Sequence, residues 1–175
     1  MILLCTERLV LRNLCEKDVG IIFDYRNNEI CARYQRGQVK DYDGILDMIK
    51  SHKDDEISLE YPSVFAIALK DSDELVGEIA VMPADGTISL GYTISYRHHR
   101  KGFAFEALNA LINCLHEKFP DCDFISFTES ENVPSMALLK KLGYKYLGYL
   151  PSKKSQVFGK WTSAETEEEI AQATK

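Results

Sequence analysis

The sequence has no long hydrophobic run. No apolar stretch approaches the ~20 residues that a membrane-spanning helix needs. Glu7, Arg8 and Arg12 interrupt the apolar residues near the N-terminus before the core of a signal peptide can form. We therefore expect a domain with a cytoplasmic location and no membrane partner.

Cysteine patterns that hold metals or disulfide frameworks are also missing. The five cysteines are odd in number, include no CxxC pair and show no metal-ligand spacing with the four histidines. We expect reduced, mostly buried thiols and no bound metal.

An excess of positive charge is missing too. The 21 Lys and Arg residues are outnumbered by 27 Asp and Glu residues, which gives a formal net charge of -6. Proteins that bind nucleic acid rely on basic surface to neutralise phosphates, so the balance argues against that partner. The 175 residues fit one domain, with no internal repeat or low-complexity linker.

Hydrophobic periodicity and turn residues predict the elements. Alternation predicts a strand over Arg8–Leu14, and helical spacing predicts two short helices after it. Three further strands joined by short turns predict an antiparallel meander. The helices are expected over Glu16–Asn28 and Asp41–His52, and the meander strands over Val64–Lys70, Leu75–Met82 and Thr87–Ser95.

The second half alternates helices and strands. Apolar residues at 3-to-4 spacing predict a long helix over Gly102–Phe119, and Pro120 stops it. Strands are expected over 123–129, 144–150 and 154–161, with a short helix over 132–143 and a frayed or solvent-facing helix in the tail over 163–175. This order predicts an α/β layered domain with a mixed sheet, in which a helix crosses over between two parallel strands.

A basic run stands in front of the long helix. Residues 97–101 read RHHRK, and Gly102 and Ala104 follow. The first turn of a helix has unpaired N–H groups and partial positive charge, and small residues let an anion approach the backbone. The pattern favours a phosphate site, although a solvated basic loop explains the run as well. It matches neither a Walker A loop nor a Rossmann GxGxxG.

The stretch RHHRKGFAFEAL resembles the acyl-CoA pyrophosphate loop of the GNAT (GCN5-related) N-acetyltransferases. That loop reads Q/R-x-x-G-x-G/A and often continues to Glu-Ala-Leu. His99 to Ala104 occupy the six loop positions here, and Glu106, Ala107 and Leu108 follow. His99 departs from the usual Gln or Arg.

Other segments resemble the family in the same order along the chain. TERLVLRNL (Thr6–Leu14) is similar to the opening of the subgroup that includes the ribosomal-protein alanine acetyltransferases. LGYTIS matches the splayed central strand, and ENVPSMALLKKLGYK (Glu131–Lys145) matches a late segment. The resemblance implies a GNAT-like mixed, mostly antiparallel central sheet with helices on both faces. It implies one acyltransferase domain over residues 1–162, followed by a polar tail over 163–175.

The resemblance further implies acetyl transfer from acetyl-CoA to a primary amine, on a peptide or protein N-terminus or a small molecule. The amine would attack directly in a ternary complex, without a metal. The implied cofactor contacts are Thr93 and Ile94 for the thioester oxygen, the loop residues His99, Arg100, Lys101, Gly102, Phe103, Ala104 and Phe105 for the pyrophosphate, and Asn132 for the pantetheine arm.

The acid and base of this reaction do not carry over directly. Ser89 and Leu139 stand where the family often has a Glu base and a Tyr acid. We predict Glu78 as the base, because it lies on the adjacent strand, and Ser135 as a donor to the leaving thiolate. Glu129, Glu131, Tyr92 and Tyr144 are further candidates, and each of these side chains also has an ordinary structural reading.

The family's acceptor site lies among the N-terminal helices and late loops, here Ile21–Tyr34, Asp41–His52 and the region past Tyr149. Tyr25, Tyr34, Asp24, Glu29, Asp41 and Asp43 are candidates to recognise a cationic amine, or are ordinary helix residues. A second class of function is a non-catalytic acyl-CoA-binding regulatory module, and a third is a nucleotide phosphate-binding domain. Either a monomer or a homodimer is compatible with the sequence.

Overall fold

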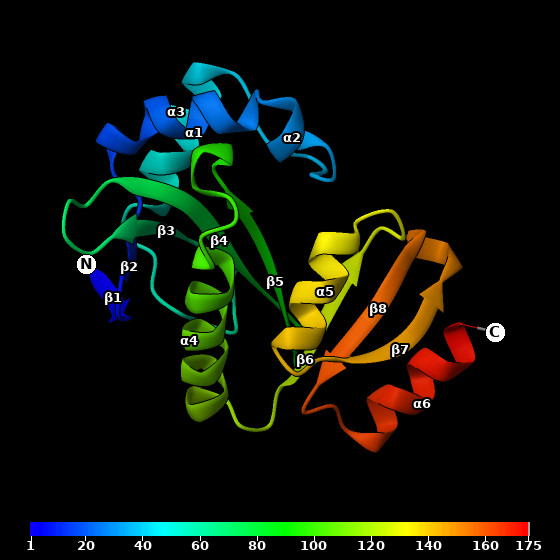
Figure 1. Ribbon diagram of the computed structural model, residues 1–175. Helices are drawn as coiled ribbons and strands as arrows, with labels where there is room; N and C mark the ends of the chain where they lie inside the picture. Colours follow the sequence, from blue (N-terminus) through cyan, green and yellow to red (C-terminus); the bar gives the residue numbers. More distant parts are fainter. Residues whose placement is uncertain (175) are drawn as a thin grey trace.

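A computed structural model describes residues 1–174 of the chain as a single eight-stranded sheet with helices on its faces (Figure 1). The strand order is β1-β2-β3-β4-β5-β6-β8-β7. The strands are β1 (Ile2–Cys5), β2 (Leu9–Asn13), β3 (Ser63–Leu69), β4 (Leu75–Ala84), β5 (Thr87–Ile94), β6 (Asp123–Thr128), β7 (Lys145–Leu150) and β8 (Ser155–Lys160). The α-helices are α1 (Val19–Arg26), α2 (Glu29–Ala32), α3 (Tyr42–His52), α4 (Phe103–Lys118), α5 (Val133–Lys141) and α6 (Ala164–Ala173).

Every strand pair is antiparallel except β5 with β6, which confirms the predicted mixed, mostly antiparallel sheet. The α/β class, the meander and the crossover through α4 are also as predicted. Two elements were not expected: β1, which pairs with β2, and α2, which is one turn long. The predicted helix over 16–28 begins as a 3₁₀ turn and continues as α1.

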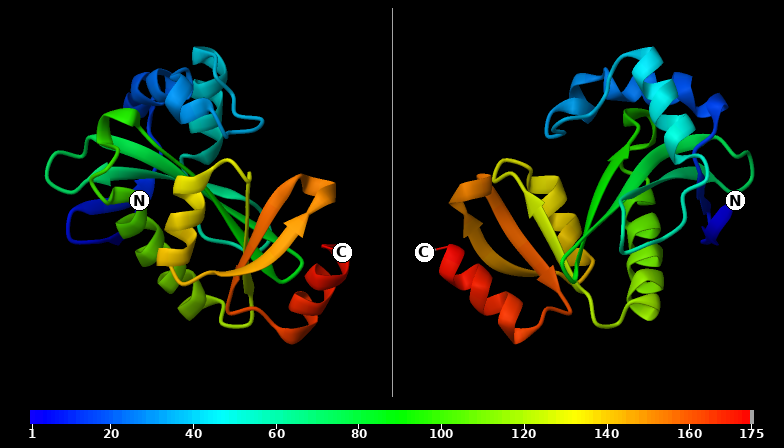
Figure 2. Two further views of the ribbon diagram at one scale, coloured as in Figure 1. Left: turned by 45° about the vertical axis from the view of Figure 1, so that its right-hand side comes forward. Right: turned by 180° about the vertical axis from the view of Figure 1, so that it is seen from behind.

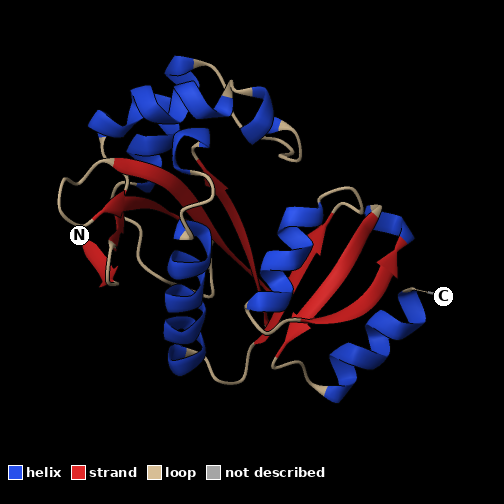
Figure 3. Ribbon diagram, viewed as in Figure 1, coloured by secondary structure: helices blue, strands red, loops and turns tan. Residues whose placement is uncertain are grey.

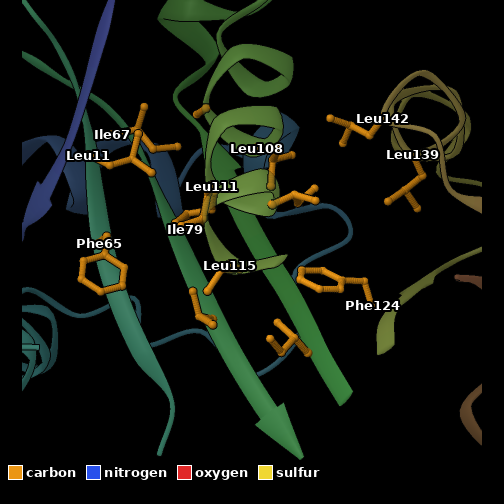
Figure 4. Close-up of a cluster of buried hydrophobic side chains, with 14 of the residues drawn as sticks. Leu11, Phe65, Ile67, Ile79, Leu108, Leu111, Leu115, Phe124, Leu139 and Leu142 are labelled. Carbon is orange, nitrogen blue, oxygen red and sulfur yellow. The ribbon is translucent and has the colours of Figure 1, made fainter. Parts of the chain in front are cut away.

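Helices cover both faces of the sheet because side chains alternate along each strand. On β3, Phe65 and Ile67 pack into one hydrophobic cluster, while Ala66 between them packs into another. The first cluster holds the apolar face of α4, where Leu108, Leu111 and Leu115 lie beside the sheet (Figure 4). The second cluster lies under α1 and α3.

The sheet splits between β5 and β6. These two strands pair through Thr87 with Asp123 and Ile88 with Phe124, and then diverge (Figure 3). One half carries β1 to β5, and the other carries β6, β8 and β7, with α5 beside the gap (Figure 2). The split exposes the edges of two neighbouring strands, and it positions the site described below.

The C-terminal segment forms helix α6, which lies along β7. None of its described residues is buried. Its N-cap residue Ser163 donates to Asp123 through its N–H at 2.9 Å and its hydroxyl at 2.9 Å, and Thr166 also donates to this carboxylate. The division at residue 162 therefore stays a prediction.

The cysteines are unpaired over the described chain, as expected. However, only Cys31 and Cys122 are buried. Cys5 lies on the exposed strand β1, so the expectation of mostly buried thiols was wrong.

Candidate active site

A large cleft opens where β5 and β6 diverge. Its volume is about 1650 Å³. Strand β5 and the start of α4 form one wall, β6 and α5 form the other, and the segment from α2 to Arg36 lies at one end. A gap between two diverging strands of one sheet leaves backbone groups facing the cavity instead of each other.

The loop between β5 and α4 shapes the first wall. Arg100 has φ 60° and Gly102 has φ 78°, both in the left-handed region that favours glycine. Gly102 caps α4 without a side-chain hydrogen bond, and the N–H of Glu106 donates to the Gly102 carbonyl at 3.1 Å. The N–H groups before Glu106 therefore have no hydrogen-bond partner within α4 and are free to bind a ligand. Left-handed turns of this kind make anion-binding concavities.

His99 supports this loop from inside. Its Nε2 donates to the carbonyl oxygen of Ile94 at 2.8 Å, at the end of β5. The imidazole thus closes the loop back on the strand. His99, which stands where the family usually has Gln or Arg, therefore stabilises the loop conformation.

The cleft gathers most of the sequence-predicted site residues. Those that line it are Thr93, Ile94, His99, Arg100, Gly102, Phe103, Ala104, Phe105, Asn132 and Ser135. Among the described lining residues, Lys101 and Glu78 do not appear. Lys101 is exposed, and its carbonyl faces Arg8 on the far side of the loop. The roles assigned to these residues stay predictions.

Glu78 lies buried behind the cleft. It is opposite Thr93 in the register of β4 and β5, so the two side chains share the face under α1 and α3. Its carboxylate pairs with Arg26 at 2.6 Å, and Gln38 donates to the same oxygen at 3.4 Å and to the Thr93 hydroxyl at 3.1 Å. Burial raises the pKa of Glu78, although Arg26 opposes the rise.

The second carboxylate oxygen of Glu78 is a buried atom without a hydrogen-bond partner among the described residues, as is the hydroxyl of Tyr25. A buried polar atom of this kind is costly unless a water or a ligand group reaches it. The Tyr25 hydroxyl also lowers the pKa of Glu78, so these two unpaired atoms lie close together behind the cleft.

Tyr92 bridges the cleft, and sequence reasoning gave it less weight than Ser135. Its hydroxyl and the Ser135 hydroxyl are 3.4 Å apart, which joins β5 to the first turn of α5. Asn132 caps α5 by accepting from the Ser135 N–H at 3.3 Å. Burial raises the pKa of Tyr92, although its hydrogen bond with Ser135 opposes the rise. Tyr144, the other tyrosine candidate, is buried away from the lining.

A segment of which sequence analysis singled out only Tyr34 crosses one end of the cleft. The Tyr34 hydroxyl donates to the Glu131 carbonyl at 3.0 Å, and Gln35 donates to the Tyr92 carbonyl at 3.0 Å. Arg36 pairs with Glu129 at 2.7 Å. Residues 34–36 therefore connect the helical layer of α1 and α2 to both walls.

The predicted acceptor candidates separate in space. Glu29 and Tyr34 line the cleft. Asp24 pairs with Arg97, Asp41 caps α3 and Tyr25 is fully buried. A smaller hollow of about 410 Å³ adjoins the cleft and shares Arg36, Phe127 and Ser155 with it, beside Lys153 and Lys154.

The described residues hold no group of three or more His, Cys, Asp or Glu side chains that fits a metal ion. Within residues 1–174, no helix is long and apolar enough to cross a membrane.

Comparisons with known proteins agree on one family. The family model for the acetyltransferase (GNAT) domain matches residues 8–145. The uncharacterized N-acetyltransferase p20 of Bacillus licheniformis is 31% identical over 152 residues, which covers 84% of each chain.

Solved structures agree on the fold. A putative ribosomal-protein-serine acetyltransferase from Vibrio cholerae has a TM-score of 0.76 at 22% identity, covering 91% of this chain and 97% of its own. The ribosomal L7/L12 alpha-N-protein acetyltransferase RimL, solved in complex with coenzyme A, has a TM-score of 0.75 at 14% identity, covering 91% and 97%.

Proposed function

The chain belongs to the GNAT acetyltransferase family, and from this premise we propose that it transfers an acetyl group directly from acetyl-CoA to a primary amine. The acceptor would be a peptide or protein N-terminus or a small-molecule amine. The observation that carries the proposal is the cleft, which joins a helix N-terminus suited to a pyrophosphate with two diverging strand edges suited to a pantetheine arm.

Acetyl-CoA would lie along the wall formed by β5 and α4. The backbone of Arg100 to Phe105 would hold the pyrophosphate, and the edge of β5 near Thr93 and Ile94 would face the thioester. Asn132 lines the opposite wall, and its amide would face the arm. The coenzyme A in the RimL complex supports this choice of cosubstrate. The donors are backbone and neutral side chains, so the placement needs no metal.

In the reaction, the amine nitrogen would attack the thioester carbon after it loses a proton. The C–N bond forms, the C–S bond breaks and coenzyme A leaves as a thiolate. Backbone N–H groups at the β5 edge would stabilise the oxyanion. Glu78 would accept the amine proton through its unpaired oxygen, by way of a water, because the side chain is buried behind Thr93.

The leaving thiolate would meet the Tyr92 and Ser135 pair. Both hydroxyls line the cleft and they are within hydrogen-bond distance of each other. Ser135 would donate a proton to the sulfur, and Tyr92 would restore the Ser135 proton. The second proton that the amine nitrogen loses as the amide forms would return to Tyr92 through water. A thiolate with a pKa near ~8.5 leaves readily, so this contribution is modest.

The acceptor would enter beside residues 34–36. Lys153 and Lys154 lie at the adjoining hollow, and Arg36 is balanced by Glu129. Four basic residues and three acids gather at this end: Arg33, Arg36, Lys153 and Lys154 with Glu29, Glu129 and Glu131. The charge is mixed, so an acceptor with a charged group of either sign beside its amine would find a partner there. We place the reaction in the cytoplasm, in a monomer or homodimer whose domain spans residues 1–162.

A screen of acceptors tests this function. We expect acetyl-CoA to bind in calorimetry, and thiol release to require both acetyl-CoA and an amine. Peptides that differ in one acidic, neutral or basic residue beside the N-terminus would show the charge preference. No affinity for acetyl-CoA would overturn the proposal.

A non-catalytic acyl-CoA-binding module is the second candidate, because Ser89 and Leu139 replace the usual acid and base and Glu78 is ion-paired. This alternative predicts acetyl-CoA binding without thiol release across a broad panel of amines.

A further inference from the structure

Two motifs from opposite parts of the chain meet beside the pyrophosphate loop. The turn between β1 and β2 contains Thr6 and Arg8, and Glu106 lies in the first turn of α4. Thr6 Oγ1 donates to Glu106 Oε1 at 2.6 Å, and the Arg8 N–H donates to the same oxygen at 2.8 Å. Arg8 Nε donates to Glu106 Oε2 at 2.7 Å. Both carboxylate oxygens are therefore held by one turn of the chain.

The Arg8 guanidinium also contacts the loop itself. Its Nη1 donates to the Lys101 carbonyl at 2.9 Å, and its carbon lies 4.6 Å from the centre of the Phe103 ring. A Cβ on Gly102 would meet Arg8 Nη2 at 3.4 Å. One side chain thus contacts Lys101 and Phe103 and lies beside Gly102 between them.

This geometry directs the loop's backbone. A trans peptide is planar, so its C=O and N–H point in opposite directions. Holding the Lys101 carbonyl toward Arg8 turns the N–H of Gly102 to the opposite side, away from the β1–β2 turn. Gly102 lines the cleft, whereas Lys101 is not among the described lining residues.

The contacts of Thr6 and Arg8 also determine the charge state of Glu106. An acid in the first turn suits the helix dipole but would repel a bound pyrophosphate. Although burial alone would raise the pKa of Glu106, the bonds from Thr6 and Arg8 hold it below its ordinary value, so the group stays ionised. Arg8 neutralises the charge of Glu106, so this carboxylate does not cancel the attraction of the first-turn N–H groups for an anion.

We infer that Arg8 is a positioning residue for acetyl-CoA: through Lys101 and Glu106, it fixes the loop in the conformation that binds the pyrophosphate. The inference rests on the proposed function, since it assigns the loop to that cosubstrate. A purely structural link between the hairpin and α4 would lower stability without a specific effect on the cosubstrate.

The experiment compares Arg8→Met, Arg8→Lys and Lys145→Met by acetyl-CoA KM and kcat, coenzyme A Kd and Tm. Lys145 is a matched control, because its ion pair with Glu167 is exposed and lies on β7. We expect Arg8→Met to raise acetyl-CoA KM and coenzyme A Kd about tenfold with kcat within about twofold. Arg8→Lys should restore charge but not the two-point geometry, so it should rescue less than half of the effect on a logarithmic scale.

Glu106→Gln offers a second test of the inference if Arg8→Met cannot be purified as a folded protein. It weakens the Arg8 contact, so we expect coenzyme A Kd to rise about threefold. In the double variant, the two effects should be less than additive. Unchanged Kd in the Arg8 and Glu106 variants, whatever their Tm, would overturn the inference alone. Failure of the wild-type chain to bind coenzyme A would overturn the proposed function and the inference together.

Discussion

Gly102 is the residue whose backbone conformation matters most for the proposed binding of the cosubstrate. Its φ of 78° is strained for any side chain, and a left-handed β-branched residue costs about 1–2 kcal/mol. We therefore expect Gly102→Val to raise acetyl-CoA KM about tenfold or more. Arg100→Ala should raise it about threefold at most, because alanine adopts the same backbone as arginine there and only a screened charge is lost. Steady-state kinetics would decide, and the reverse order would mean that side-chain charge dominates.

Glu78 is the residue whose proposed role depends most on protonation. Burial raises its pKa above the ordinary 4.5, and a base acts only when deprotonated. We therefore expect kcat to fall as pH drops through this raised pKa. Glu78→Gln should lower kcat roughly 100-fold and remove that acidic limb, with acetyl-CoA KM unchanged. The same raised pKa gives a stability contribution that is present below pH 4.5 and lost as pH rises through the folded-state value.

A matched control separates this role from the loss of a buried ion pair. Asp18 pairs with Arg12 at 2.8 Å and is 2% exposed, away from the cleft. Breaking either buried pair should cost about 3–5 kcal/mol of unfolding free energy. Asp18→Asn should leave kcat and its pH profile intact, and equal pH profiles for the wild type and Glu78→Gln would rule out Glu78 as the base.

At the residue scale, sequence reasoning located the backbone loop but not its supports. Gly102 and Ala104 stand in a local pattern, so they could be read directly. Arg8 and Glu106 are 98 positions apart, and neither local sequence indicates that the two side chains are in contact. The same holds for Arg26, whose pairing with Glu78 depends on α1 crossing over β4.

At the element scale, the segment from Tyr34 to Arg36 connects the two sides of the cleft. Its contact between Arg36 and Glu129 is an exposed ion pair, and such pairs contribute about 0–1 kcal/mol. Arg36→Met should therefore leave Tm almost unchanged. It should raise the acceptor KM about threefold or more and leave the acetyl-CoA KM within twofold, because the segment lies at the end of the cleft where we propose that the acceptor enters. Acceptor and acetyl-CoA KM values measured in parallel would test this, and an increase confined to acetyl-CoA would contradict the placement.

Element predictions succeeded where periodicity was long. Helix α4 spans Phe103–Lys118 and shows its buried face directly in the sequence. The four residues of α2 are too few for a helical period, and β1 reads Ile-Leu-Leu-Cys without alternation. The segment that crosses the cleft is irregular, so its position follows from tertiary contacts and not from its own sequence.

At the scale of the whole molecule, the two halves of the sheet meet at the base of the cleft, where Asp123 pairs with Thr87. Asp123 is 8% exposed, and its N–H donates to the Gly86 carbonyl at 3.0 Å. Its carboxylate accepts from Ser163 and Thr166 at the start of α6. The polar composition of residues 163–175 concealed this anchoring, because the contact uses two hydroxyls and one backbone N–H.

Ending the chain at Thr162 would remove the three donors to the Asp123 carboxylate together with the helix beside it. Hydrogen bonds to a charged group contribute about 1.5–3 kcal/mol. A loss of ~2 kcal/mol corresponds to a Tm about 4–8 °C lower in a chain of this size. We expect that decrease for the truncated chain, with acetyl-CoA KM within about twofold, because none of the described cleft residues lies beyond Ser155. Thermal denaturation and kinetics would measure both.

The full-length double variant Ser163→Ala and Thr166→Val is the matched comparison, since it removes the hydroxyl donors and keeps α6. If anchoring of Asp123 is the reason for the loss, the double variant should reproduce more than half of the decrease in Tm. An unchanged Tm after truncation would instead make residues 1–162 the complete folding unit, with α6 as an appendage. A truncated chain that kept its Tm but lost acetyl-CoA binding would contradict both readings, because it would require α6 to act on the cleft across β7 and β8.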